Sequence, residues 1–271
     1  MALDTISTAD FERFRRLLYQ QSGIHLADNK QPLLIGRLGR RLRELEIDAF
    51  GEYFDMVSRP GGEVERQRMI DLLTTNETHF FREPQHFVFL REQVLPHHPA
   101  GTPFRAWSAA SSTGEEAYTL AFELAEKFGD AAWEIVGTDI SHRVVAQARL
   151  GVYPIERSTE IPPALLKKYC LRGVRSQAGS MRVMAHLVQR THFLPANLLA
   201  PLPDIGRFDV IFLRNVMIYF DLETKRRVVE NVLSRLKPGG TLFIGHAETL
   251  QNVSERVQLV KPTIYRLSGA H

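Results

Sequence analysis

Residues 104–127, FRAWSAASSTGEEAYTLAFELAEK, decide the fold class of this chain. They read as a strand that ends in a run of small residues, followed by a helix from Gly114 to about Lys127. WEIVGTDI (133–140) is predicted to be a second strand, and SHRVVAQARL (141–150) a second helix. Strands that alternate with helices in this way predict an α/β fold, with a parallel sheet covered by helices on both faces.

The alternation continues toward the C-terminus. FDVIFLRN (208–215) has the consecutive apolar residues of a buried strand, a helix is predicted over about 222–236, and TLFIGHAE (241–248) is a further strand. The end of the chain differs, because VQLV (257–260) and TIYRL (263–267) flank a Lys-Pro pair and predict an antiparallel hairpin.

Residues 7–75 have helical patterns throughout. Ser7 or Thr8 can cap a first helix. A later segment carries leucines at helical spacing on one stripe, which is typical of a packed amphipathic helix: Leu34, Leu38, Leu42 and Leu45.

We therefore predict three parts. An all-α domain spans 1–75, a linker spans 76–102, and an α/β domain spans 103–271. Short alternating runs between the second and third parallel strands predict a small β-subdomain insertion in the α/β domain at about 171–194.

Composition excludes several classes of protein. Cys170 is the only cysteine, so neither a disulfide framework nor a cysteine-rich metal site is possible, and the ten histidines lack a metal-ligand spacing. We therefore predict no metal. No apolar run approaches the roughly 20 residues needed to span a bilayer, and the N-terminus does not resemble a secretion signal. These features predict a soluble, cytoplasmic protein without membrane insertion. A formal net charge of +3 does not by itself demand a nucleic-acid partner.

The small residues before Gly114 point to a nucleotide-like cofactor, because they allow backbone amides at a helix start to approach a ligand. An ordinary capped turn also explains them. Glu115 and Glu116 disfavour a pyrophosphate and favour a cationic amino group, which points to S-adenosylmethionine rather than NAD. Asp139, at the end of the second strand, is placed to bind ribose hydroxyls. The alternative is that Asp139 caps the next helix together with Ser141.

Five stretches, in this order, resemble the motifs of the CheR family of chemotaxis receptor methyltransferases: TTNETHFFREPQHF (74–87), WSAASSTGEEAYTLA (107–121), GTDISHRVVAQARLGVY (137–153), FLRNVMIYFD (212–221) and LKPGGTLFIGHAE (236–248). The resemblance covers nearly the whole chain. It implies a class I, Rossmann-like S-adenosylmethionine methyltransferase fold. It also implies transfer of a methyl group to glutamate carboxylates of receptors, with S-adenosylhomocysteine as product.

The resemblance also implies site residues. The cofactor contacts would be Asn76, Thr78, Arg82, Glu116, Asp139, Asn197, Leu198, Arg214 and Asn215. Arg214 and Tyr219 would line the transfer site as catalytic residues. In the alternative, Asn76 and Thr78 are helix-end caps, and Arg82 pairs with Glu77 or Glu83 on the surface.

The leucine-rich helix of the N-terminal domain carries a basic run: Arg37, Arg40, Arg41 and Arg43. By resemblance these residues would dock the cytoplasmic helical domain of a chemotaxis receptor, and the β-subdomain would take a receptor C-terminal peptide. A solvated helix face is the ordinary explanation of such a run, and nucleic acid is a competing partner. We predict a monomer that binds no nucleic acid. The two rival functions are a nucleic-acid methyltransferase and a non-catalytic adaptor.

Overall fold

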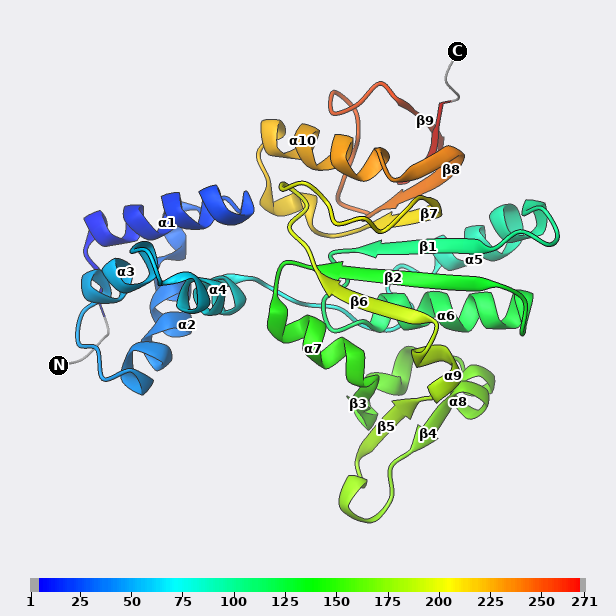
Figure 1. Ribbon diagram of the computed structural model, residues 1–271, viewed down its shortest axis with the longest axis horizontal. Coiled ribbons are helices and arrows are strands. Elements are labelled where there is room, and N and C mark those ends of the chain that lie inside the picture. The colour runs from blue at the N-terminus through cyan, green and yellow to red at the C-terminus, as the bar shows by residue number, and fades with distance from the viewer. Residues whose placement is uncertain (1–4, 269–271) are drawn as a thin grey trace. The chain divides into compact units, whose positions relative to one another are not determined.

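A computed structural model gives the structure of the protein, which we describe for residues 5–268 (Figure 1). The chain forms two compact units. One comprises Met1–Thr75 and Tyr219–Thr224, and the other comprises Asn76–Ile218 and Lys225–His271. The predicted linker, 76–102, is thus part of the second unit.

The first unit is a bundle of helices. Its elements are α1 (Thr8–Ser22), the 3-10 turn η1 (Asp28–Lys30), α2 (Gln31–Glu44), α3 (Phe50–Ser58) and α4 (Glu63–Leu73). Ser7 caps α1 by accepting a hydrogen bond from the Asp10 amide, and Gly23 ends it in the left-handed conformation. The sequence therefore predicted the start of this helix correctly.

The leucine stripe of α2 lies in the core of the first unit. Leu34, Leu38 and Leu42 are fully buried, whereas Leu45 is only partly buried. The amphipathic helix predicted from leucine spacing is confirmed.

The segment Tyr219–Thr224 joins the first unit, although the sequence analysis had assigned it to the α/β domain. The Tyr19 hydroxyl donates to the Asp221 carboxylate over 2.7 Å, and the His25 amide donates to the Tyr219 carbonyl over 2.9 Å. Periodicity carries no sign of these contacts, because they join residues about two hundred positions apart.

The second unit is built on a seven-stranded sheet in the order β6-β2-β1-β7-β8-β10-β9. The strands are β1 (Phe104–Ala109), β2 (Trp133–Asp139), β6 (Thr191–Pro195), β7 (Phe208–Leu213), β8 (Leu236–Ile244), β9 (Val257–Lys261) and β10 (Ile264–Leu267). The first five strands in this order are parallel to one another, and β10 is antiparallel to both of its neighbours, β8 and β9. The predicted α/β sheet with an antiparallel C-terminal hairpin is confirmed.

Helices and short turns complete the unit. They are α5 (Gln85–Phe89), the π-helix η2 (Leu90–Val94), η3 (Leu95–His97), α6 (Glu115–Phe128), α7 (His142–Leu150), η4 (Ile155–Glu160), α8 (Pro163–Tyr169), η5 (Arg175–Gln177), α9 (Ala185–Val188), η6 (Met217–Tyr219) and α10 (Leu222–Leu233). Helix α6 packs against β1, β2 and β6. Helix α10 ends at Leu233 rather than the predicted 236, because Leu236 already pairs with Phe208 in the sheet.

The β-subdomain is a second, antiparallel sheet in the order β3-β5-β4, with strands β3 (Val152–Pro154), β4 (Cys170–Arg172) and β5 (Ser180–Val183). The predicted bounds, 171–194, were wrong at both ends. The first strand lies earlier, at 152–154, and residues 191–195 form β6 in the main sheet. Strand β6 lies at the sheet edge and alternates between buried and more exposed residues, so it lacks the continuous apolar run of an inner strand.

Within residues 5–268, the structure contains no helix that is long and apolar enough to cross a bilayer.

Candidate cofactor site

The loop from β1 to α6 turns sharply at the carboxyl end of the parallel sheet. Ala110 (φ 63°), Ser112 (φ 50°) and Gly114 (φ 94°) all adopt left-handed backbone angles. A Cβ at Gly114 would lie 2.9 Å from the Ala148 Cβ, so only glycine fits there. The small residues predicted to bring the backbone close to a ligand therefore form a tight, strained turn.

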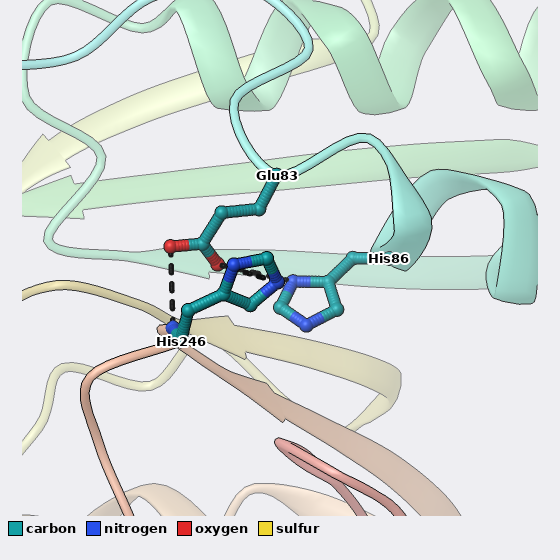
Figure 2. A group of neighbouring side chains, drawn as sticks. All are labelled: Glu83, His86 and His246. Carbon is teal, nitrogen blue, oxygen red and sulfur yellow. Dashed lines mark hydrogen bonds and ion pairs between the residues drawn. The ribbon is translucent and has the colours of Figure 1, made fainter.

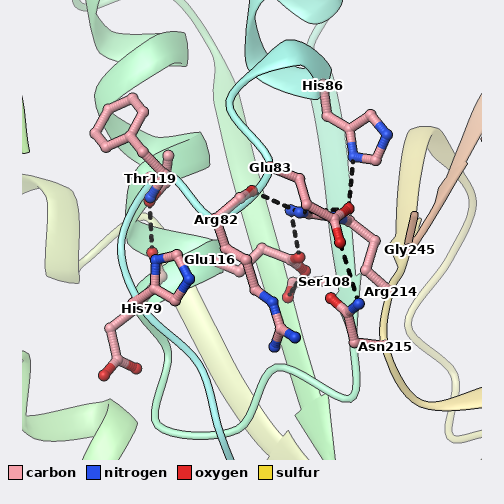
Figure 3. Close-up of polar contacts among 12 residues, drawn as sticks. His79, Arg82, Glu83, His86, Ser108, Glu116, Thr119, Arg214, Asn215 and Gly245 are labelled. Carbon is pink, nitrogen blue, oxygen red and sulfur yellow. Dashed lines mark hydrogen bonds and ion pairs between the residues drawn. The ribbon is translucent and has the colours of Figure 1, made fainter. Parts of the chain in front are cut away.

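Glu115 and Glu116 follow this turn but have different surroundings. The Glu116 carboxylate accepts a hydrogen bond from the Ser108 hydroxyl over 2.6 Å and pairs with Arg214 over 3.0 Å (Figure 3). The Glu115 carboxylate instead accepts from the Thr113 hydroxyl over 2.6 Å. Burial raises the pKa of both carboxyls, while for Glu116 the charge of Arg214 acts in the opposite direction.

Arg214 follows the end of β7, and its side chain is 1% exposed. The guanidinium pairs with Glu116 on one side and with Glu83 on the other, at a distance of 3.0 Å in each case. It also donates a hydrogen bond to the Arg82 carbonyl (Figure 3). Two carboxylates already compensate its charge. These contacts favour a role in holding the segment around Glu83 against the strand end, rather than in binding a further anion.

Glu83 accepts hydrogen bonds from the Asn215 side-chain amide over 3.1 Å and from the His246 backbone amide over 3.2 Å. Burial opposes its ionisation, but the charge of Arg214 and these hydrogen bonds prevail and lower the pKa of Glu83 to about 2. Glu83 is therefore a carboxylate at neutral pH. Sequence reasoning considered it only as a surface partner of Arg82.

Arg82 has no carboxylate partner within residues 5–268. Its guanidinium donates to the Glu77 backbone carbonyl over 2.9 Å, and it points away from Glu83 (Figure 3). Within residues 5–268, Arg82 thus contacts Glu77 only through the backbone and forms no ion pair with the carboxylate of Glu77 or Glu83, and Arg214 pairs with Glu83 instead. This leaves a positive charge beside the buried Glu116, whose pKa it helps to lower.

Asn76 and Thr78 lie between helices in a segment without regular secondary structure, since Thr74 is the C-cap of α4 and Pro84 the N-cap of α5. The Asn76 carbonyl accepts a hydrogen bond from the Ser112 hydroxyl over 2.9 Å. The Thr78 carbonyl accepts from Arg157 over 2.7 Å. The segment is thus fastened to the turn before α6, and the helix-cap alternative is wrong.

Asp139 ends β2, and its carboxylate accepts the amides of Ser112 and Ser141, each over 2.9 Å. The Ser141 hydroxyl caps α7. Asp139 thus positions both the turn before α6 and the start of α7. This agrees closely with the alternative in which Asp139 and Ser141 together cap the helix after β2. Binding of ribose by Asp139 stays a prediction.

Asn197 and Leu198 follow β6 at the same edge of the sheet. The Leu199 backbone amide donates to the Asn197 side-chain oxygen at 3.0 Å, and the Asn231 side-chain amide donates to the carbonyl of the buried Leu198 at 2.8 Å. Carboxyl ends of neighbouring parallel strands form the usual ligand crevice of such sheets. The second-unit residues predicted to contact the cofactor thus follow β2, β6 and β7 or lie on the segments packed against them.

Glu248 is a residue that sequence reasoning missed. Its partly buried carboxylate accepts hydrogen bonds from the backbone amides of Gly245 (2.7 Å), Asn215 (3.0 Å) and Met217 (2.8 Å), so it joins the loops after β7 and β8. Burial raises its pKa, and these backbone hydrogen bonds oppose the rise. A Cβ at Gly245 would lie 2.5 Å from the Asn215 side-chain nitrogen, so the close packing of these two loops requires glycine at this position. This glycine was the one sequence signal that pointed to the contact made by Glu248.

Replacing Glu248 with glutamine should lower the free energy of unfolding by about 1–3 kcal/mol, because one carboxylate oxygen that accepts backbone amides becomes a donor facing them. Urea denaturation followed by circular dichroism measures this. Glu255→Gln, at an exposed carboxylate, should stay within about 0.5 kcal/mol of the parent protein. Equal stability of the two variants would contradict this role of Glu248.

The four arginines of α2 are not equivalent. Arg37 donates to the Leu73 carbonyl over 2.7 Å, and Arg41 pairs with Glu65 over 2.7 Å, so both hold the bundle together. Arg40 is 83% exposed and pairs only with Glu44, and Arg43 is exposed without an ion pair to the described residues. Arg40 and Arg43 are therefore the two that present charge to solvent.

Tyr219, predicted to be catalytic, lies in η6 and belongs to the segment that packs with the first unit. Its role in transfer stays a prediction.

Comparison with known proteins agrees with this architecture. The model of the CheR methyltransferase SAM-binding domain matches residues 76–266, and that of the CheR all-alpha domain matches residues 9–74. The chain is 43% identical to chemotaxis protein methyltransferase 2 of Pseudomonas aeruginosa, over 94% of this chain and 92% of that protein. It is 41% identical to the chemotaxis protein methyltransferase of Salmonella typhimurium, over 97% and 91%, and 40% identical to that of Escherichia coli, over 97% and 92%. The chain therefore belongs to the CheR family of chemotaxis methyltransferases, which use S-adenosylmethionine.

Proposed function

We propose that this protein transfers the methyl group of S-adenosylmethionine to glutamate side chains in the cytoplasmic helical domain of chemotaxis receptors, with S-adenosylhomocysteine as the second product. The observation that carries the proposal is the Glu116 carboxylate, only 13% exposed, beside the Arg82 guanidinium, which forms no ion pair within residues 5–268. Together they match a zwitterionic amino acid, the methionine part of the cofactor. The protein would act in the cytoplasm as a monomer and without nucleic acid.

The residues present fit the cofactor by their chemistry. Glu116 would bind its ammonium group and Arg82 its carboxylate, while Asp139 would accept from the ribose hydroxyls. Asn197 and Leu198 would border the adenine. Asn76, Thr78, Arg214 and Asn215 would complete the surroundings, with Arg214 acting mainly through Glu116.

When bound, the cofactor supplies an electrophilic methyl group on a sulfonium. A glutamate carboxylate has an unperturbed pKa of about 4.3, so at neutral pH it is already the nucleophile and no general base is needed. The protein must orient the carboxylate and remove water from it, and orientation alone is worth up to about 7–11 kcal/mol. We propose that Tyr219 borders the transfer position.

The substrate-binding part of the proposal rests on charge and on a free sheet edge. Arg40 and Arg43 would attract glutamate-rich receptor helices. Strand β4 is an edge strand of the β-subdomain with the exposed Leu171, so a receptor C-terminal peptide would add a strand there.

The direct test is transfer of tritiated methyl groups to membranes that contain chemotaxis receptors, followed by mild alkali. We expect labelled methanol, because carboxyl methyl esters hydrolyse in base. Duplex DNA and structured RNA serve as parallel substrates. Label that stays on nucleic acid and resists alkali would replace this proposal with a nucleic-acid methyltransferase, and no label on any substrate would favour an adaptor.

Reversing the charges of Arg40 and Arg43 to glutamate should raise the KM for receptor about tenfold or more, with little change in affinity for S-adenosylmethionine, because only the encounter with an acidic partner is weakened. Methylation rates at several receptor concentrations and salt concentrations measure this. Arg59→Glu, at an exposed arginine outside α2, is the matched control. An equal KM for the double variant and the control would remove α2 from docking.

A further inference from the structure

Glu83, His86 and His246 come together in the second unit (Figure 2). One potential ligand atom from each residue lies within 4.8 Å of the other two. Glu83 and His86 lie at the start of α5, whereas His246 lies on the loop after β8, so the spacing of histidines in the sequence did not reveal the cluster. None of the cofactor contacts described above uses either histidine ring.

The protonation of His86 follows from its neighbours. The Thr263 hydroxyl lies 2.5 Å from the Pro262 carbonyl, which can only accept, so the hydroxyl donates there. The Thr263 oxygen then accepts from His86 Nε2, 2.8 Å away. This assigns the proton to Nε2 and leaves a lone pair on Nδ1.

The Nδ1 lone pair accepts no hydrogen bond from the described residues. His86 is 1% exposed, and its Nδ1 has no hydrogen-bond partner among the described residues. It lies 3.5 Å from a Glu83 carboxylate oxygen. A positive charge between the buried lone pair and the carboxylate would stabilise both. Without it, the unpaired nitrogen costs free energy because it is buried without a hydrogen bond.

The geometry fits a tetrahedral ion. Metal-ligand bonds of about 2.0–2.2 Å place the ligand atoms of tetrahedral Zn²⁺ about 3.4 Å apart. Glu83 Oε2 lies 3.5 Å from His86 Nδ1 and 3.9 Å from His246 Nε2. The His246 side chain is 55% exposed, so a small rotation of its ring closes the remaining gap and leaves a path to solvent.

We propose that Glu83 Oε2, His86 Nδ1 and His246 Nε2 bind one Zn²⁺ ion, with water in the fourth position. The hydrogen bond of Thr263 to His86 Nε2 is the outer-shell contact that orients a metal-ligating histidine. The positively charged Arg214 lies 3.0 Å from the same Glu83 oxygen, and its charge weakens binding of the ion. Glu116, on the other side of Arg214, offsets part of the arginine charge. The ion would join the segment before β1 to the loop after β8 and would take no part in methyl transfer.

The test uses chelator-treated full-length protein titrated calorimetrically with ZnCl₂, and with CoCl₂ while visible absorption is recorded. We expect one equivalent of Zn²⁺ and the intense visible absorption of tetrahedral Co²⁺. His246→Ala should weaken binding more than tenfold, since it removes a ligand from an exposed position, and Thr263→Ala about 10–100-fold. Melting curves without metal confirm that each variant folds.

His192→Ala is the matched control, because His192 is 57% exposed and lies 4.0 Å from the Glu134 carboxylate, outside the cluster. It should bind Zn²⁺ like the parent protein. Absence of stoichiometric binding by the parent protein, or equal binding by the His246→Ala and His192→Ala variants, would overturn the proposal.

Discussion

Replacing Arg214 with methionine is expected to lower the free energy of unfolding by about 3–5 kcal/mol. Methionine is unbranched like the stem of arginine but carries no charge, so the carboxylates of Glu83 and Glu116, only 11% and 13% exposed, would lose the cation between them. Removing one partner of a buried ion pair leaves an uncompensated buried charge, which is the costly case. Urea denaturation followed by tryptophan fluorescence or circular dichroism measures the change.

Arg256→Met in the same unit is the control for this variant. Arg256 pairs with Glu230 over 2.7 Å, but both side chains are about half exposed, at 49% and 48%. Solvent screens such a pair, so its loss should cost only about 0–1 kcal/mol. If the Arg214 and Arg256 variants lose equal stability, the network around Arg214 does not hold the segment at Glu83 in place.

Replacing Glu116 with glutamine is expected to weaken binding of S-adenosylmethionine about 10–150-fold, which corresponds to the roughly 1.5–3 kcal/mol of a hydrogen bond to a charged group. Glutamine keeps the shape and the hydrogen bond to Ser108 but removes the charge that would attract the ammonium group. Calorimetric titration with S-adenosylmethionine measures the affinity. The same reasoning predicts weaker binding as the pH falls through the raised pKa of Glu116, because the protonated acid carries no charge.

The neighbouring acid supplies the control. Glu115→Gln removes a neighbouring carboxylate that is even less exposed, at 2% against 13%, and that accepts its hydrogen bond from the Thr113 hydroxyl rather than from Arg214. It should retain most of the affinity. If Glu115→Gln loses the binding and Glu116→Gln keeps it, the two acids must exchange the roles assigned to them here.

Local patterns predicted much of the second unit because the relevant signals lie within one element. Strands β1 and β2 are buried at every position but the second, and α6 begins directly after its left-handed glycine. Strand β6 was missed, because one face of an edge strand is open and the apolar run is broken. The strands of the β-subdomain have three or four residues each, which is too few to recognise the alternation of apolar and polar residues that is typical of a strand.

The candidate site was only partly predictable. The motifs placed Asp139 and Arg214 at strand ends and Glu116 at the start of a helix, and the structure brings Glu116 and Arg214 into contact. Their partners were not foreseen. Glu83 lies 131 positions from Arg214, and Glu248 lies 33 positions from Asn215, so strand order and loop packing alone decide these contacts.

The sequence by itself determined the family, the α/β class, the leucine-lined helix and the acidic turn, since each depends on local patterns or on the order of local motifs along the chain. Only the tertiary structure decided that Arg214 lies buried between two carboxylates, that Arg82 has no acidic partner within residues 5–268, and that the distant His246 joins Glu83 and His86. The physical reason is that charge compensation inside a protein depends on distance in space, and the parallel sheet brings to one edge residues that the chain keeps far apart.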